Sequence, residues 1–180
     1  MVRTAFAPSC PYGSLLHMEA LMSISSRLAK YLEQRGALYE ICSHEHSRCS
    51  AETARTAHVP PHQLAKSVIV EDDDGLVMAV VPADKYVKLG VLSRMLDRKQ
   101  LRLAEESRLA TLFADCELGA VSAIGMAWGI QTIVDEEIED SDFIYIEGGD
   151  HECLLRMSRA QFCELMRAQR RGRFCGVSVH

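Results

Sequence analysis

Two β-rich runs joined by a tight turn constrain the fold more than any other part of this 180-residue sequence. The runs cover residues 66–71 and 76–81, and the turn between them reads Asp-Asp-Asp-Gly. Aspartate and glycine favour tight turns, because aspartate hydrogen-bonds its own backbone and glycine accepts positive φ. Two strand-forming runs joined in this way form an antiparallel hairpin. We therefore expect a β-sheet built around this hairpin.

Helical and extended patterns alternate along the rest of the chain. In residues 19–35, apolar residues recur at spacings of three and four, which predicts an amphipathic helix that Gly36 ends in the left-handed conformation. Ser50 and Ser158 are candidate N-caps. Further helices are predicted at residues 50–58, 91–98, 105–113 and 158–170, with a helical turn from Pro61. Strands are predicted at residues 37–43, 100–103, 131–134, 143–147 and 153–157.

This order of elements predicts an α+β fold. Helices and strands are mixed without regular βαβ repetition, so we expect a single domain with a curved, mostly antiparallel or mixed sheet flanked by helices. We place the domain at residues 19–170, after a flexible leader at 1–18 and before a C-terminal tail at 171–180. A chain of 180 residues is long enough to bury one core.

Composition excludes several classes of protein. The net charge of −5 argues against a protein that coats DNA or RNA nonspecifically, because such binding depends on neutralising phosphates. No apolar run is long enough to cross a bilayer. The seven cysteines have no regular spacing, which indicates reduced packing residues in a reducing compartment. We therefore expect a cytoplasmic protein without a membrane or DNA partner.

Charge is distributed unevenly near the C-terminus. Residues 134–152 hold nine acidic residues and no Lys or Arg, whereas residues 159–173 hold five Arg against one acidic residue, Glu164. If RNA is a partner, the predicted C-terminal helix is therefore a better RNA-binding surface than the acidic strands before it.

Two features could contribute chemistry near the hairpin. Lys66 is a lone cation at the start of an apolar strand, where it could bind an anion, although from spacing alone a strand-end lysine that reaches water is the commoner case. The segment Gly119-Ala-Val-Ser-Ala-Ile-Gly125 fits neither the helical spacing of apolar residues nor the alternation of a strand. Its glycines allow close backbone approach, so its amides could hold an anion or a carbonyl oxygen, and a simple connecting turn is the alternative.

Two further clusters carry histidine. His151 follows Gly148-Gly149-Asp150 in a turn between strands, where it could orient a substrate or be a solvent-facing loop residue. The segment from Cys42 to Cys49 contains two histidines and has zinc-ligand residue types, but its spacing fits no standard structural zinc site. We expect no metal and no cofactor, because the sequence contains no phosphate-binding loop or dinucleotide fingerprint.

Taken in order, these pieces resemble the YbaK family, which is also described as the prolyl-tRNA-synthetase-associated editing domain and its free-standing deacylase relatives. The resemblance covers roughly residues 19–166. It rests on the segments that follow one another along the chain: His44 to Ser50, Ala65-Lys66-Ser67-Val68, the strand that ends at Pro82, Leu92-Ser93, Gly119 to Gly125, Val134-Asp135, and Gly149-Asp150-His151.

The resemblance implies a trans-editing hydrolase that removes a small amino acid from mischarged tRNA. Lys66 would hold the terminal adenosine phosphate or the aminoacyl ester. The loop would line the amino-acid pocket and place backbone amides at the developing oxyanion, with Gly125 in the catalytic group and His151 at the pocket. The loop's pocket residues are Gly119, Val121, Ser122, Ala123 and Ile124. The implied partners are the acceptor end of an aminoacyl-tRNA and an aminoacyl-tRNA synthetase.

One departure from the family pattern leaves two alternatives open. Relatives carry one or two prolines where this chain has Ser122 and Ala123, and the loss of proline loosens a loop. A non-catalytic protein of the same fold that binds tRNA or a synthetase is the first alternative. A thiol- or zinc-dependent regulator built on the Cys42–Cys49 cluster is the second. The sequence leaves the amino acid open among Cys, Ala, Ser, Thr and Pro.

Overall fold

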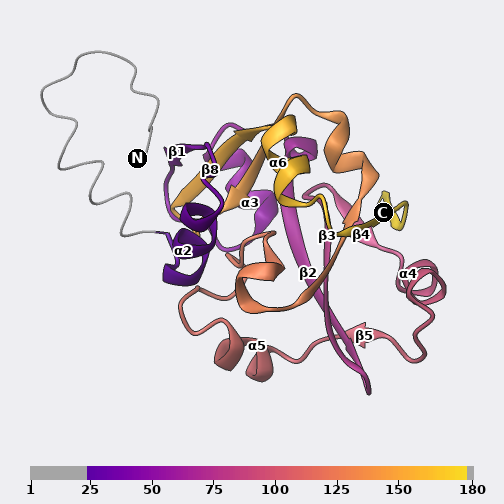
Figure 1. Ribbon diagram of the computed structural model, residues 1–180. Coiled ribbons are helices and arrows are strands. Elements are labelled where there is room, and N and C mark those ends of the chain that lie inside the picture. Colours follow the sequence, from indigo (N-terminus) through magenta and orange to yellow (C-terminus); the bar gives the residue numbers. More distant parts are fainter. Residues whose placement is uncertain (1–23, 178–180) are drawn as a thin grey trace, which may run out of the picture.

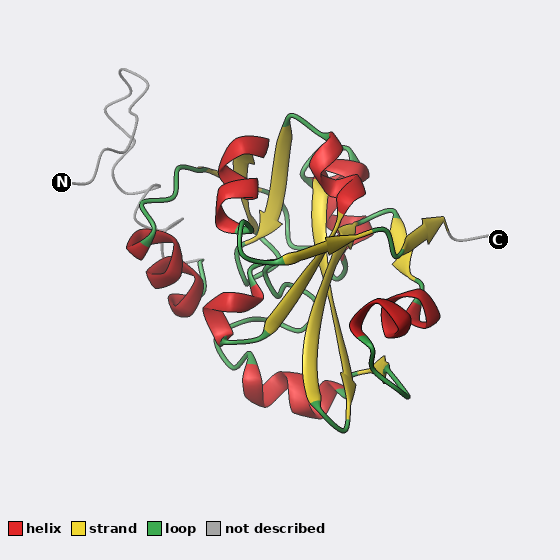
Figure 2. Ribbon diagram, turned by 45° about the vertical axis from the view of Figure 1, so that its right-hand side comes forward, coloured by secondary structure: helices red, strands yellow, loops and turns green. Residues whose placement is uncertain are grey.

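The computed structural model describes residues 24–177, in which helices flank a central β-sheet (Figures 1 and 2). The helices are α2 (Ser26–Gln34), α3 (Ser50–Thr56), α4 (Leu89–Leu96), α5 (Glu106–Leu112) and α6 (Arg159–Leu165), with 3-10 turns η1 (Pro61–Gln63), η2 (Gly125–Trp128) and η3 (Glu136–Asp140). The strands are β1 (Glu40–Ser43), β2 (Leu64–Asp72), β3 (Gly75–Pro82), β4 (Lys85–Val87), β5 (Arg102–Leu103), β6 (Gln131–Asp135), β7 (Phe143–Glu147), β8 (Cys153–Ser158), β9 (Arg170–Gly172) and β10 (Cys175–Val177).

The sheet is mixed, so the α+β prediction is confirmed. Its strand order is β1-β8-β7-β2-β3-β6-β9, with β5 paired to β2 and a separate ribbon of β10 and β4. β2 and β3 form the predicted antiparallel hairpin, with Lys66 opposite Val81. β2 pairs with β7, and β3 with β6, in the parallel direction. The hairpin runs through the middle of the molecule in Figure 1.

The two faces of β2 bury different clusters, because side chains alternate along a strand. Ala65 and Ile69 pack into the main core, to which α2, α5 and α6 contribute. Leu64 packs against Ala54 of α3, while Val70 and its neighbour Val68 pack in the cluster that contains Leu92 of α4. α3 and α4 therefore cover one face of the hairpin, and the other helices cover the opposite face.

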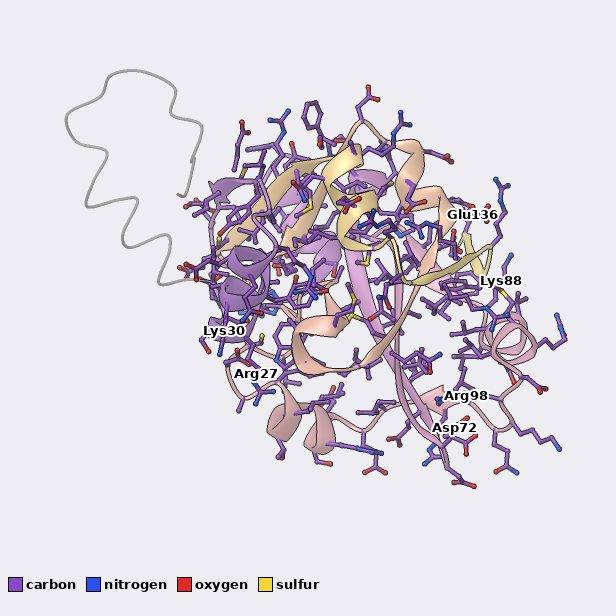
Figure 3. All side chains as sticks on the ribbon, in the orientation of Figure 1. Arg27, Lys30, Asp72, Lys88, Arg98 and Glu136 are labelled. Atoms are coloured by element: carbon purple, nitrogen blue, oxygen red, sulfur yellow. The ribbon has the colours of Figure 1, made fainter. Side chains whose placement is uncertain are left out.

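An ion pair fixes the far end of the hairpin to the segment that follows α4. Arg98 Nη1 lies 2.9 Å from Asp72 Oδ1, and Figure 3 shows the two side chains together near the tip. Both side chains are largely buried, so this pair is screened less than a surface ion pair. It keeps the long hairpin attached to the domain.

Most predicted elements are confirmed to within a few residues, and two details are wrong. Gly36 ends α2 with φ +58° and Ser158 caps α6, both as predicted. Ser50, however, is the first residue of α3, and the N-cap is Cys49, whose side chain makes no capping bond. The last helix ends at Leu165 rather than near residue 170.

The end of the chain joins the sheet instead of continuing the last helix. Residues 170–172 form β9 beside β6, and residues 175–177 form β10 beside β4, within the stretch expected to be helix end and tail. The expected leader and the expected start of the first helix lie outside the described residues. No helix among residues 24–177 is long and apolar enough to cross a membrane.

Asp135 attaches this C-terminal segment to the sheet. Its carboxylate is fully buried at the end of β6. The backbone N–H groups of Glu137, Phe174 and Cys175 donate to it at 3.0, 2.7 and 2.8 Å. Hydrogen bonds to a charged acceptor are stronger than neutral ones, and a buried carboxylate needs them.

We expect Asp135→Ala to lower the free energy of unfolding by roughly 3 kcal/mol or more, because it leaves backbone donors buried without an acceptor. Urea denaturation measures this change. Asp140→Ala is the matched control, since Asp140 is exposed at the end of η3, and it should change stability by less than about 0.5 kcal/mol. Equal losses in the two variants would contradict the role given to Asp135.

Candidate active site

The ladder between β2 and β7 ends after two residue pairs, which leaves part of the edge of β2 without a partner strand. β2 pairs with β7 only through Leu64–Tyr145 and Ala65–Ile146, and β5 pairs with β2 only from Val70 onward. Between these points the edge of β2 pairs with no strand of the described chain. The loop at residues 119–124 lies there instead, where Ser67 Oγ donates a 2.7 Å hydrogen bond to the carbonyl oxygen of Val121. We call this gap the β2–β7 split.

Lys66 lies at the β2–β7 split on the face covered by α3 and α4. Its Nζ donates to the carbonyl oxygens of Lys85 at 2.6 Å and Ala83 at 3.4 Å. Burial lowers the pKa of Lys66, and the negative charge of Asp84 partly offsets that effect. An ammonium has three donors. Two therefore hold the side chain in place, and the third has no partner among residues 24–177, so it could bind an anionic ligand.

The glycine-rich loop begins close to the same place. Gly119 has φ +89°, and a Cβ atom there would lie 3.2 Å from His151 Nε2 and 3.5 Å from the carbonyl oxygen of Arg48. Glycine is required here by its backbone conformation and by the close approach of its neighbours. Arg48 directly precedes Cys49, the N-cap of α3. This end of the loop therefore lies against the start of α3, which covers the face of β2 that carries Lys66.

The remaining loop residues run into the interior. Val121 is buried beside Ser67, and Ser122 is fully buried with its hydroxyl unpaired among residues 24–177. Ala123 and Ile124 pack in the main core, so a ligand could reach them only through their backbone. Gly125 is needed for packing, because a Cβ atom there would overlap the hydroxyl of Thr132 on β6.

The loop also carries backbone donors that the fold leaves unused. The N–H of Ala120 donates to the carbonyl oxygen of Glu117. Across the described part of the chain, the N–H groups of residues 121–124 find no backbone acceptor. Such donors, fixed by surrounding packing, can bind a carbonyl oxygen or an oxyanion.

His151 is buried rather than solvent-facing, with 2% of its surface exposed. Its Nε2 lies 2.7 Å from the carbonyl oxygen of Leu118, and a carbonyl oxygen only accepts, so this nitrogen carries the proton. The Nδ1 atom lies 3.5 Å from Ser47 Oγ. The imidazole therefore ties the start of the glycine-rich loop to the turn before β8, and its Nε2 is not free to accept a proton.

Glu147 is a buried carboxylate at the end of β7 that sequence reasoning missed. It ends β7 with 2% of its surface exposed, and neither carboxylate oxygen has a hydrogen-bond partner among the described residues. Burial raises the pKa of Glu147 to about 7, against a lowering effect of the nearby Thr53 hydroxyl and with a small further rise from the charge of Asp150. A glutamate before two glycines suggests an exposed strand end, so only the tertiary structure identifies it.

Two cavities are associated with this region. The smaller, about 100 Å³, lies beside the loop and is lined in part by Ser67, Gly119 and Val121. The larger, about 590 Å³, lies at the turn between β3 and β4, with Asp84, Lys85 and Glu137 in its wall and none of the predicted site residues. The structure thus gathers Gly119, Val121 and His151 on one side of the β2–β7 split and Lys66 on the other.

The Cys42–Cys49 cluster is not arranged as a metal site. His46 Nε2 lies 3.1 Å from Glu117, and His44 Nδ1 donates to the carbonyl oxygen of Glu45 at 2.8 Å. Cys49 is exposed, and Cys42 is partly buried in β1. Within the described chain, the metal-ligand atoms that cluster belong to Asp135, Glu137 and Cys175. Most of the cysteines were expected to be packing residues. Among those described, Cys153 and Cys175 are buried, three are partly buried and Cys49 is exposed.

Most arginines of the predicted basic RNA-binding surface form ion pairs with acidic residues. Arg171 lies 2.9 Å from Glu139, and Arg173 lies 3.0 Å from Glu136. Arg167, just past α6, makes a third, exposed pair with Glu164. Sequence analysis identified these arginines, but the partners of Arg171 and Arg173 come from the 3-10 turn η3 after β6, so the net positive charge of this surface is smaller than predicted.

Comparison with known proteins gives the family. The family described as "Aminoacyl-tRNA editing domain" matches residues 44–165, which is more than half of the chain and includes every candidate site residue. This chain belongs to the aminoacyl-tRNA editing domain family. The matched segment begins at His44 and ends with α6.

The relatives of this editing domain include parts of prolyl-tRNA synthetases. It is 25% identical over 97 residues to the proline–tRNA ligase of Lactobacillus helveticus, covering 54% of this chain and 17% of the ligase. It is 29% identical over 82 residues to that of Lactobacillus johnsonii, covering 46% of this chain and 14% of the ligase. The editing domain therefore spans about a sixth of the length of these curated relatives.

Solved structures share the fold of this editing domain. A crystal structure described as a proposed trans-editing enzyme for prolyl-tRNA synthetase superposes with a TM-score of 0.73 at 19% identity, covering 84% of this chain and 96% of the other. A hypothetical protein superposes with a TM-score of 0.74 at 21% identity, covering 84% and 100%. At this level of identity the likeness establishes the fold.

The raised pKa of Glu147 predicts that stability falls as pH rises. The native state holds the Glu147 proton up to pH about 7, whereas the unfolded state releases it near the ordinary value of 4.5. Stability is therefore lost as pH rises through this window. Glu147→Gln has no such proton, so its unfolding free energy relative to wild type should rise by roughly 1–3 kcal/mol between pH 5 and pH 8.

Urea denaturation of both proteins at each pH measures this difference. Glu152→Gln, on the same turn but exposed, is the control and should keep the pH dependence of the wild type. If Glu147→Gln also follows the wild-type pH dependence, Glu147 is not buried as described.

Proposed function

We propose that this editing domain is a trans-acting hydrolase that deacylates tRNA mischarged with a small amino acid. The observation that carries the proposal is the β2–β7 split, where Lys66 and the unused amides of residues 121–124 lie on either side of an unpaired stretch of strand. Family membership supports the reaction class, and the superposition on nearly the whole chain of a proposed trans-editing enzyme supports action in trans.

Each group has a role in the proposed reaction. A water molecule adds to the ester carbonyl, the bond to the ribose oxygen breaks, and the water proton reaches that oxygen, releasing the amino acid and tRNA. The amides of residues 121–124 would stabilise the tetrahedral oxyanion, with the unpaired hydroxyl of Ser122 as a further donor. Lys66 would hold the phosphate of the terminal adenosine through its free N–H.

His151 would act by holding the loop rather than by moving a proton. Its Nε2 proton is donated to the carbonyl oxygen of Leu118, immediately before Gly119. No step in this scheme uses a protein nucleophile or a cysteine. The ribose hydroxyl next to the ester would assist by orienting the attacking water. The proposed partner is the acceptor end of an aminoacyl-tRNA in the cytoplasm, delivered with or without a synthetase.

A non-catalytic protein of the same fold is the second candidate. The carbonyl oxygens of Ala83 and Lys85 already occupy two of the three donors of Lys66, and the loop lacks the proline that would stiffen it. In this alternative the β2–β7 split binds the acceptor end without hydrolysing the ester.

We expect the wild type to hydrolyse one or two of alanyl-, cysteinyl-, seryl-, threonyl- and prolyl-tRNA, with chelator present. Lys66→Ala should lower that rate by roughly 10²–10³-fold, because it removes the fixed positive charge. Release of the labelled amino acid measures the rate. Lys99→Ala, an exposed lysine after α4, is the control and should keep the full rate.

Two outcomes would contradict the catalytic proposal. If every ester decays at the buffer rate while the protein still binds the acceptor end, the non-catalytic alternative holds. If Lys66→Ala and Lys99→Ala are equally active, hydrolysis takes place at another site.

A further inference from the structure

We propose that Glu147 binds the α-ammonium group of the aminoacyl ester and makes the site selective for amino acids whose amino group is free. This inference rests on the proposed deacylase function and assigns a substrate-binding residue to the same site. It concerns the substrate's backbone and not its side chain, so it holds for whichever small amino acid is removed.

Glu147 and Lys66 both lie just past the paired stretch of β7 and β2. The parallel ladder of β2 and β7 ends at Ala65 and Ile146, so the next positions on the two strands are Lys66 and Glu147. Both side chains project from the same face of the sheet as Leu64 and Tyr145, which pack with Ala54 of α3. Glu147 therefore lies where the two strands separate, on the side covered by α3.

No cation among the described residues compensates the burial of the Glu147 carboxylate. Both oxygens are unpaired among the described residues, and only 2% of the residue is exposed. Lys66 does not neutralise it, because the Lys66 ammonium is directed at the carbonyl oxygens of Ala83 and Lys85. Buried polar groups normally have partners, and one without a partner in a binding site is a candidate for ligand contact.

Other groups near Glu147 do not supply the missing partner. The Thr53 hydroxyl on α3 lies near the Glu147 carboxylate and lowers its pKa, but it is a neutral group that also bonds with the hydroxyl of Ser47 at 2.6 Å and donates to the carbonyl oxygen of Cys49. His151 donates its Nε2 proton to Leu118. Asp150 in the following turn is negative and disfavours the charged carboxylate. A ligand that brings a positive charge and hydrogen-bond donors would satisfy Glu147 where these neighbours do not.

An aminoacyl ester carries such a group next to the reacting carbonyl. Its α-ammonium offers three donors and a positive charge on the carbon attached to the ester. An ammonium held by Glu147 would orient that carbonyl with respect to the amides of residues 121–124. An N-acetylated amino acid has lost the charge and most of the donors, so its binding would leave the carboxylate buried and unpaired.

The test compares two esters on the same tRNA: the aminoacyl-tRNA that the wild type hydrolyses fastest and its N-acetyl derivative. We expect the wild type to hydrolyse the free amino ester at least about 100-fold faster than the acetylated one. Glu147→Gln should slow only the free amino ester and reduce this ratio to within a few-fold. Glu147→Asp, which keeps the charge on a shorter side chain, should give a ratio between those of Glu147→Gln and the wild type. Glu152→Gln should keep the wild-type ratio.

The possible results separate this inference from the proposed function. If the wild type hydrolyses both esters equally, or if Glu147→Gln slows both by the same factor, Glu147 has a structural role and the inference fails while the deacylase function stands. If the wild type hydrolyses neither ester, the proposed function itself fails and the inference with it. Equal hydrolysis of the two esters by the wild type is sufficient to overturn the inference, even if Glu147→Gln does not fold.

Discussion

The early end of the ladder between β2 and β7 is the constraint on which the site depends. After two residue pairs the strands separate, and the edge of β2 is left to the glycine-rich loop. A continuous ladder would have used the backbone groups of Ser67 and would have put Glu147 into a regular pair opposite Lys66. The separation instead leaves the backbone donors of the loop on one side of the split, and the side chains of Lys66 and Glu147 on the side covered by α3.

Two buried carboxylates in this domain show the difference between a structural and a functional charge. Asp135 receives three backbone N–H groups and joins the C-terminal strands to the sheet. Glu147 receives none from the described residues, and burial raises its pKa to about 7. A carboxylate that is fully hydrogen-bonded stabilises the fold, whereas an unpaired buried one lowers stability. That contrast is the reason for proposing Glu147 as a substrate-binding residue.

Local patterns in the sequence predicted much of the fold and part of the site. The Asp-Asp-Asp-Gly turn gave the β2–β3 hairpin, and apolar alternation gave β6, β7 and β8, because turn chemistry and periodicity act over a few residues. The parallel pairing of β2 with β7 and the joining of β9 to β6 link segments far apart in the chain, and no local signal specifies them. For the same reason the sequence indicated Lys66 and the glycine-rich loop but not Glu147, or that Ala123 and Ile124 lie in the core.

The most direct test of the central claim, that the β2–β7 split is the active site, is a crystal structure with a hydrolysis-resistant 3′-aminoacylamino-adenosine. This account predicts that the amide carbonyl of the ligand contacts the backbone N–H groups of residues 121–124, with Lys66 at its adenosine end. A ligand bound instead in the larger cavity, against Asp84 and Glu137, would contradict the account, because no predicted site residue lines that cavity.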